Sequence, residues 1–250
     1  MTTYAQSGVN NDLKEQASKM LYEAAKRTWE NRKGKFGEII SAHDDFSALR
    51  GINVGNLPEG TMLSLGFDGV GTKMELGERL NKHDTVAFDL FAMVCDDAVV
   101  RGAEPVLVGS ILDVKSLKTP EGNYFLDQLS QLANGYEAAA KAARVAVING
   151  EIAELGARVS GYGAFNYNWG ASVALFAQKH RAITGKDIAP GQALVGLREY
   201  GFRSNGLSLV RKIFREHFGE EYQSYGHVTM QALRPSTIYC AAVCDMFGGA

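Results

Sequence analysis

The chain has 250 residues, of which 46% are hydrophobic and 22% are charged, and its formal net charge is −2. This composition is typical of a globular protein, and the near-neutral charge gives no reason to expect nucleic acid or an anionic membrane as a partner. Cys95, Cys240 and Cys244 form neither a disulfide framework nor a paired metal motif, which fits a reducing cytosol. No stretch approaches eighteen uncharged apolar residues, so we expect no membrane span.

The hydrophobic pattern predicts elements that alternate along the chain. In chain order these are a helix over 11–29, a strand over 61–67, helices over 74–80 and 86–100, a strand over 106–112, a helix over 123–143, strands over 144–148, 169–177 and 193–197, and helices over 204–218 and 236–246. Strands that alternate with long helices indicate an α/β or α+β fold. A turn-rich connection over 183–191 separates two strand-containing blocks, so we expect two domains, 1–180 and 181–250.

The stretch Asp68-Gly-Val-Gly-Thr-Lys73 joins a carboxylate, two glycines, a hydroxyl and a lysine directly after a predicted strand. A carboxylate there can hold Mg²⁺, the glycines let the backbone approach a phosphate, and the lysine neutralises it. The spacing is not that of a P-loop. The motif therefore indicates a phosphate-binding loop, although an ordinary glycine turn remains the alternative.

Three aspartates, Asp89, Asp96 and Asp97, lie in the apolar helix predicted over 86–100. Buried without partners they would cost much free energy. Either they face a metal ion, or one points to solvent and another caps a neighbouring helix. Because Mg²⁺ takes several oxygen ligands near a polyphosphate, the metal interpretation is favoured once Asp68 and the following His83-Asp84 are added.

Glu151 follows the strand predicted over 144–148, and chemistry in α/β proteins often occurs at strand ends. Taken alone, a solvated turn is the simpler interpretation of this residue. His83 likewise has an ordinary alternative, that of a hydrogen-bonded surface residue.

Taken in order, the motifs of the chain resemble those of the phosphoribosylformylglycinamidine cyclo-ligases, the aminoimidazole ribonucleotide synthetases of purine biosynthesis. The resemblance runs through nearly the whole chain. It is carried by Tyr4-Ala-Gln-Ser-Gly-Val9, Gly34-Lys-Phe-Gly37, Asp68-Gly-Val-Gly-Thr-Lys73, His83-Asp-Thr85, Asp89-Leu-Phe-Ala-Met93, Asp96-Asp97, Gly102-Ala-Glu-Pro105, Asn149-Gly-Glu-Ile-Ala-Glu154, Ser204-Asn-Gly-Leu-Ser-Leu-Val-Arg211 and Arg234-Pro-Ser-Thr-Ile-Tyr239.

This resemblance implies an enzyme that uses ATP and Mg²⁺ to close the imidazole ring of formylglycinamidine ribonucleotide, releasing ADP and phosphate. It also implies a cytoplasmic homodimer with a two-domain α/β fold, whose N-terminal domains pair their sheets. The C-terminal domain would be incomplete at residue 250, because family members continue further.

The resemblance also assigns expected roles to residues. Mg²⁺ would be held by Asp68, Asp96 and Asp97. Catalytic roles would belong to Glu151, Lys73 and His83. ATP would contact Lys35, Gly37, Gly69, Gly71, Thr72, Lys73, His83 and Asp84. The substrate would meet Ser204, Asn205 and Gly206.

Three departures from the family pattern concern the substrate side. Asn149 stands where a glycine is usual, Ile152 where a hydroxyl residue is usual, and Arg203 where a histidine commonly precedes Ser-Asn-Gly. The pattern therefore leaves two alternatives open. One is a related ATP-dependent enzyme with an altered substrate, and the other is a non-catalytic nucleotide-binding dimer.

Overall fold

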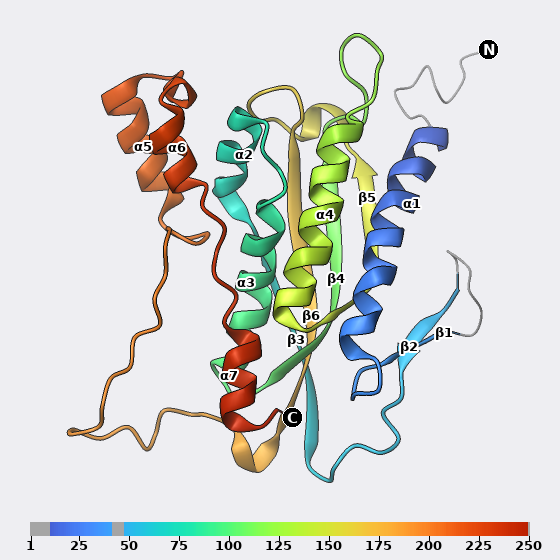
Figure 1. The fold of residues 1–250 in the computed structure, drawn as a ribbon, viewed down its shortest axis with the longest axis vertical. Coiled ribbons are helices and arrows are strands. Elements are labelled where there is room, and N and C mark those ends of the chain that lie inside the picture. The colour runs from blue at the N-terminus through green and yellow to red at the C-terminus, as the bar shows by residue number, and fades with distance from the viewer. Residues whose placement is uncertain (1–10, 42–47, 250) are drawn as a thin grey trace.

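A four-stranded mixed sheet, in the order β3-β6-β4-β5, forms the centre of the fold (Figure 1). The computed structural model describes residues 11–41 and 48–249, so the motif at 4–9 lies outside the described residues. β6 is antiparallel to both of its neighbours, whereas β4 and β5 are parallel. The strands are β3 (Thr61–Gly69), β4 (Glu104–Val114), β5 (Ala146–Glu154) and β6 (Tyr167–Gln178).

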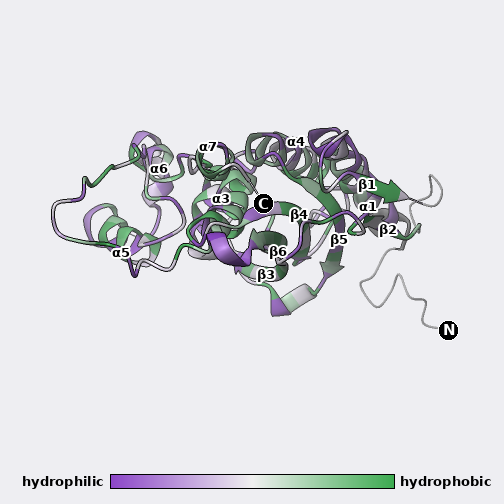
Figure 2. Ribbon diagram, turned by 90° about the horizontal axis from the view of Figure 1, so that it is seen from below, coloured by the Kyte–Doolittle hydropathy of each residue, from purple (hydrophilic) through white to green (hydrophobic). Residues whose placement is uncertain are grey.

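Helices cover one face of this sheet, as the view along it shows (Figure 2). The helices are α1 (Asn11–Arg27), α2 (Met74–Leu80), α3 (Val86–Val99), α4 (Leu126–Ala143), α5 (Leu207–Phe218), α6 (Gly226–Ala232) and α7 (Cys240–Phe247). A separate two-stranded sheet, β1 (Ile39–Ser41) with β2 (Arg50–Ile52), lies beside α1. No described helix has the length and apolar character needed to span a bilayer.

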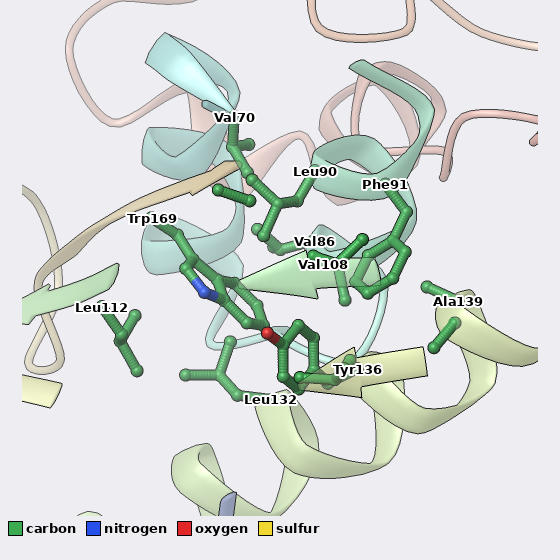
Figure 3. Packing of buried hydrophobic residues seen from close by; sticks show 14 of the residues in the cluster. Val70, Val86, Leu90, Phe91, Val108, Leu112, Leu132, Tyr136, Ala139 and Trp169 are labelled. Atoms are coloured by element: carbon green, nitrogen blue, oxygen red, sulfur yellow. The ribbon is translucent and has the colours of Figure 1, made fainter. Parts of the chain in front are cut away.

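The core lies between α3, α4 and the sheet (Figure 3). Alternate residues of a strand point to the same face, so Trp169 and Val173 of β6 both enter it. The rings of Trp169 and Tyr136 are 5.2 Å apart between centroids, and those of Phe91 and Tyr136 are 5.4 Å apart. This aromatic cluster fixes the helices on the sheet.

The opposite face of the sheet carries exposed apolar side chains. Leu63, Leu65 and Phe67 alternate along β3 and are 61%, 58% and 73% exposed. Ile111 of β4 is 56% exposed and lies on the same face, because it pairs with Gly170, which in turn pairs with Gly69. Within the described part of the chain, these four side chains, here named the open apolar face, remain largely uncovered.

The carboxyl ends of β3, β4 and β5 lie at one edge of the sheet, since β6 runs opposite to β3 and β4. The loop after β3 and the start of β6 meet there, at the top of Figure 1. We call this the carboxyl edge. It matters because ligands of open α/β sheets bind outside the carboxyl ends of the strands.

After β6 the chain forms one 3₁₀ turn, Lys179–Arg181, then runs without regular structure, and then returns to the sheet domain. α5 and α6 pack beside α2, and α7 packs against α3 and α4 (Figure 1). Cys240 of α7 is fully buried in the main core. The expected domain boundary at 180/181 stays a prediction. Although α7 follows this boundary in the sequence, it packs in the main core with residues that precede it.

Most expected elements form within a few residues, but three expectations were wrong. The stretch 68–73 is not a loop throughout, because β3 pairs with β6 as far as Gly69. Residues 193–197 form no strand, and Leu194 is fully exposed, because the described chain offers this segment no neighbouring strand to pair with. Glu151 does not follow a strand: β5 continues to Glu154, because its backbone pairs with β4 as far as Val114. The elements α6, β1 and β2 were not predicted from the sequence.

Candidate active site

A cleft of about 460 Å³ lies at the carboxyl edge. Gly71 and Thr72 line it from the loop after β3, and Asp113, Asn168 and Arg158 line it from β4, β6 and the turn after β5. Gly71 has a φ of +67°, a conformation that glycine adopts without strain. The cleft therefore joins part of the predicted phosphate loop to a carboxylate, an amide and a guanidinium.

Lys73, at the end of the same loop, is turned away from solvent. Its Nζ donates to Asp89 Oδ1 at 2.6 Å and to the carbonyl oxygen of Arg234 at 2.5 Å, and neither the Lys73 nor the Asp89 side chain is exposed. Burial lowers the pKa of Lys73 and raises the pKa of Asp89, while their mutual attraction opposes both shifts. In this arrangement Lys73 binds the chain itself, and contact with a phosphate would require its release.

Asp89 holds the segment before α7 as well. Its Oδ1 accepts hydrogen bonds from the backbone N–H and the hydroxyl of Ser236, at 3.1 and 2.5 Å. The motif around Arg234 therefore docks onto α3 through a buried carboxylate. This explains how an aspartate is accommodated in an apolar helix: it is paired and hydrogen-bonded.

Asp96, two turns further along α3, accepts hydrogen bonds on both carboxylate oxygens, whereas Asp89 Oδ2 has no partner among the described residues. Its Oδ2 accepts from Arg203 Nη2 at 2.7 Å, and its Oδ1 accepts from the backbone N–H groups of Tyr239 and Cys240 at 2.9 and 2.8 Å. Arg203 also bonds Glu199 at 3.1 Å and has a φ of +53°, which is unusual for a residue other than glycine. Asp97, the next residue, is exposed.

His83 is fully buried rather than at the surface. Its Nδ1 lies 3.1 Å from the Tyr167 hydroxyl and its Nε2 lies 3.3 Å from Asn81 Oδ1. Burial lowers the pKa of His83 from 6.5 to about 4, so the ring is neutral at pH 7. The adjacent Asp84 pairs with Lys82 at 2.8 Å. Both residues hold the connection between α2 and α3.

Glu151 lies apart from this region. It is exposed, and it lines a different cavity, between α1 and the β4–β5 end of the sheet, together with Asn149 and Gly150. Lys35 and Gly37 lie at the edge opposite the carboxyl edge, where β4 begins. A Cβ at Gly37 would lie 2.1 Å from Val106 Cγ1, so packing explains this glycine.

Ser204, Asn205 and Gly206 lead into α5. Gly206 has a φ of +73° and precedes the first residue of the helix, and Asn205 is exposed. The Ser204 hydroxyl is buried and has no hydrogen-bond partner among the described residues. This motif lies beside Arg203, and so beside the contact to Asp96 on α3.

Comparison with known proteins places the chain in a family. The model for "AIR synthase related protein, N-terminal domain" matches residues 44–168. The phosphoribosylformylglycinamidine cyclo-ligase of Thermococcus kodakarensis is 33% identical over 98% of this chain and 69% of its own length, and that of Pyrococcus furiosus is 34% identical over 98% and 68%. The chain belongs to the phosphoribosylformylglycinamidine cyclo-ligase family. Among solved structures, Escherichia coli HypE, a hydrogenase maturation protein, aligns with 13% identity and a TM-score of 0.48, over 71% of this chain and 47% of its own.

The cyclo-ligase chain contains no group of three or more acidic, His or Cys side chains placed to hold a metal ion, as far as its structure is described. Mg²⁺ is nevertheless often bound by one or two carboxylates together with phosphate oxygens and water. Asp68, whose Oδ1 accepts from the N–H of Gly69 at 2.7 Å, is partly buried near the end of β3, and Asp97 is exposed on α3, but neither is among the residues that line the cleft. Asp96 is available to a metal only if Arg203 and two backbone N–H groups release its oxygens.

The structure places several residues at or beside the cleft that were not predicted from the sequence. Asp113, Asn168 and Arg158 join the cleft only because the end of β4, the start of β6 and the turn after β5 lie at the same edge. Glu78 is buried, accepts from the N–H groups of Tyr162 and Tyr167, and has its pKa raised to about 7 by burial. Asp113 directly follows the strand predicted over 106–112, and this position was the one signal in the sequence that could have pointed to it.

Proposed function

We propose that this chain closes the imidazole ring of formylglycinamidine ribonucleotide with ATP, giving aminoimidazole ribonucleotide, ADP and phosphate. The step belongs to de novo purine biosynthesis, and we place it in the cytoplasm. The observation that carries the proposal is the match to named cyclo-ligases over 98% of the chain. The position of Gly71 of the motif in the carboxyl-edge cleft supports it independently of the names.

The chemical difficulty of this reaction is its leaving group. A formyl oxygen of an amide leaves poorly, whereas phosphate leaves well. Phosphorylation of that oxygen allows a substrate nitrogen to attack the same carbon and expel phosphate. The protein mainly has to position two anionic reactants and stabilise the charge on the transferring phosphoryl group.

The carboxyl-edge cleft is the proposed phosphate site. The backbone at Gly69, Gly71 and Thr72 can approach phosphate oxygens closely, and Asp68 with Asp97 would hold Mg²⁺. The metal, when bound, neutralises phosphate charge. Lys73 would act after release from Asp89, and Asp96 would join the metal site after release from Arg203 and from two backbone N–H groups. His83 and Asp84 would support the nucleotide site by fixing the start of α3.

The substrate side is proposed to lie with the second domain, 181–250. Ser204, Asn205 and Gly206 would contact formylglycinamidine ribonucleotide, and Glu151 would act near the reacting groups. Lys35 and Gly37 lie at the opposite edge of the same chain, so their predicted contact with ATP requires a second chain or a large rearrangement.

A homodimer is proposed through the open apolar face. This face is a row of exposed apolar side chains, whose contact with water is unfavourable. It consists of Leu63, Leu65, Phe67 and Ile111. A second copy of the sheet offers a matching apolar surface, and isologous pairing of this kind is the commonest form of homo-oligomer.

One observation favours a second candidate function. Lys73 and Asp96 are both engaged by the chain itself, which suits a nucleotide-binding dimer without turnover. The three departures from the family pattern are also compatible with an enzyme that has an altered substrate. They are Asn149, Arg203 and Ile152, of which Ile152 is buried in the core.

Release of ADP by the purified protein with MgATP separates these functions. The proposal predicts release that depends on formylglycinamidine ribonucleotide and that equals the aminoimidazole ribonucleotide formed. ATP binding without release would support the non-catalytic dimer. Release with a related amide ribonucleotide only would support an altered substrate, and either result would reject the proposal.

A further inference from the structure

Glu78 of α2 is a buried carboxyl group beside the carboxyl-edge cleft, and the proposed ring closure makes no use of it. It is only 6% exposed. Its Oε2 accepts from the N–H of Tyr162 at 2.9 Å, and its Oε1 accepts from the N–H of Tyr167 at 3.1 Å. One carboxyl group therefore ties two points of the chain to α2, one before β6 and one at its first residue.

The chain around these two points is shaped to fit Glu78. A Cβ at Gly161 would lie 2.3 Å from Glu78 Oε2, and a Cβ at Gly163 would lie 2.5 Å from the Glu78 carbonyl oxygen. Gly163 also has a φ of +69°, which glycine adopts without strain. Asn166 Nδ2 donates to the carbonyl oxygen of Tyr162 at 2.7 Å and closes the segment on itself. Since close approach and hydrogen bonding both centre on Glu78, this residue determines where the segment lies.

The same segment forms one wall of the cleft. Residues 158–162 line the cleft together with Glu78, and residues 158–167 are here named the cleft wall. Arg158 contributes a guanidinium to this wall, a group suited to phosphate oxygens. Because Tyr162 is tied to Glu78, the place that Arg158 can take depends on Glu78 as well.

Glu78 holds its proton more tightly than an ordinary carboxyl group. Burial raises its pKa from 4.5 to about 7, although the hydrogen bonds from the two backbone N–H groups lower it. The like charge of Glu75, on the same helix, raises the pKa of Glu78 further. Glu75 is itself paired with three arginines: Arg79, Arg211 and Arg215. Glu78 therefore gains or loses its proton near neutral pH.

Other titratable and charged groups reach this region from the neighbouring elements. Burial raises the pKa of the Tyr167 hydroxyl well above its usual range, so this group stays protonated. His83, 3.1 Å from that hydroxyl, has its pKa lowered to about 4 by burial and is neutral at pH 7. The cleft also presents charged side chains from β4, the cleft wall and α5, which are Asp113, Arg158 and Arg211.

We propose that Glu78 is a positioning residue of the carboxyl-edge cleft, which holds the cleft wall and its Arg158 against α2 while the carboxyl group is protonated, and that the wall opens more readily once this group ionises. A protonated carboxyl group keeps acceptor capacity for both N–H groups. An ionised carboxylate is stabilised by water, which reaches Glu78 only when the wall opens. The value of this wall to catalysis rests on the proposed function, because the cleft is the proposed phosphate site. Its closure is a property of the protein without ligand.

The direction of the pH dependence follows from the pKa of Glu78 in the two forms. With the wall closed this pKa is about 7, and on exposure it returns toward 4.5, so the closed form binds the proton more tightly. Opening therefore becomes easier as the pH rises from 4.5 to 7, and it levels off above 7. Between pH 5 and 7.5 the equilibrium constant for opening should increase at least about tenfold and up to about fiftyfold.

Hydrogen exchange of the Tyr162 and Tyr167 amides, followed by NMR in ¹⁵N-labelled protein without ligand, tests this proposal. Rates at pH 5 and 7.5 are divided by those of unstructured peptides at the same pH, which removes the intrinsic pH dependence of exchange. We expect the protection of both amides to fall at least about tenfold over this range. Both should also be less protected than the core amide of Leu132 in α4, because local opening requires less free energy than global unfolding.

Two matched variants assign the pH dependence. Glu78→Gln has no proton to lose, so the protection of the two amides should change less than about threefold between pH 5 and 7.5, whatever its absolute level. Glu154→Gln is the control, because Glu154 also accepts a backbone N–H, that of Leu117 at 2.9 Å, but does not belong to the cleft wall. It should keep the pH dependence of the unmodified protein. Circular dichroism checks that both variants fold.

Three results would overturn the proposal: protection of the Tyr162 and Tyr167 amides that stays constant or rises with pH, protection equal to that of Leu132, or an undiminished pH dependence in Glu78→Gln. The first two need no substitution, so a misfolded variant does not leave the question open. Exchange is measured without turnover, so a failure of ring closure would reject the proposed function and leave these results unchanged.

Discussion

Lys73 Nζ and Asp89 Oδ1 lie 2.6 Å apart in a site where neither side chain reaches solvent. The pair connects the predicted phosphate loop to α3, and through Ser236 it also connects the segment before α7. Lys73, which belongs to a motif predicted to bind a ligand, therefore helps to hold the loop after β3, α3 and the segment before α7 together.

Removal of one partner of this pair should destabilise the fold strongly. Lys73→Met leaves Asp89 buried without its counter-charge, and we expect a loss of about 3–5 kcal/mol in the free energy of unfolding. Equilibrium urea denaturation measures it. The double variant Lys73→Met/Asp89→Leu should lose less than the single one, because no charge is left unpaired. A single-variant loss below about 1 kcal/mol would contradict the buried pair.

The pH dependence of stability should carry a signature of His83. Its folded pKa of about 4 lies below 6.5, so the unfolded chain binds the proton more tightly. Stability is then lost as the pH falls from 6.5 toward 4, by up to about 3 kcal/mol. Glu78, with a pKa raised from 4.5 to about 7, acts in the opposite direction, because stability is lost as the pH rises through that interval.

The difference between unmodified protein and His83→Gln isolates the histidine, since Glu78 is common to both. Thermal or urea unfolding at several pH values should show that His83→Gln is less sensitive to acid between pH 6.5 and 4. Parallel curves for the two proteins would show that His83 is not buried as described.

Asp96 is expected to anchor the start of α7. Asp96→Ala removes the acceptor of the Tyr239 and Cys240 N–H groups and the counter-ion of Arg203. Hydrogen bonds to charged groups contribute about 1.5–3 kcal/mol, so exchange of these two amide protons should accelerate at least about tenfold. Hydrogen exchange with mass spectrometry measures it. Asp97→Ala, one residue away and exposed, is the control and should leave both amides protected.

Dimerisation should depend on the open apolar face. Phe67→Glu places a charge on the proposed interface, and we expect the protein to sediment as a monomer in analytical ultracentrifugation. Leu209→Glu on α5 is the matched control, since Leu209 is 63% exposed and Phe67 is 73% exposed but the two lie on different surfaces. A Phe67→Glu protein that stays dimeric would exclude this face.

Local sequence signals predicted the helices and strands well where the spacing of apolar residues alone determines the structure. The strand that begins at Thr61, the helix 74–80 and the helix ending at Ala143 needed only apolar spacing and turn residues. Residues 193–197 failed, because a strand also needs a neighbour, and neighbours are not visible in a local pattern. Glu151 was misplaced for a related reason: the length of β5 is set by its pairing with β4.

The contacts of the site were less predictable than its elements. The cost of burying Asp89 and Asp96 was foreseen, but their partners come from distant segments: Ser236 is 147 residues from Asp89, and Arg203 is 107 residues from Asp96. No short-range rule supplies such pairs. The burial of Lys73 and His83 follows from the same packing, and it too was missed.

The central claim is that the formyl oxygen of the substrate becomes the leaving group as phosphate. Formylglycinamidine ribonucleotide labelled with ¹⁸O in the formyl group tests it most directly, with mass spectrometry of the products after incubation with MgATP. We predict one ¹⁸O in each molecule of inorganic phosphate and none in ADP. Label released to water, with unlabelled phosphate, would contradict the account.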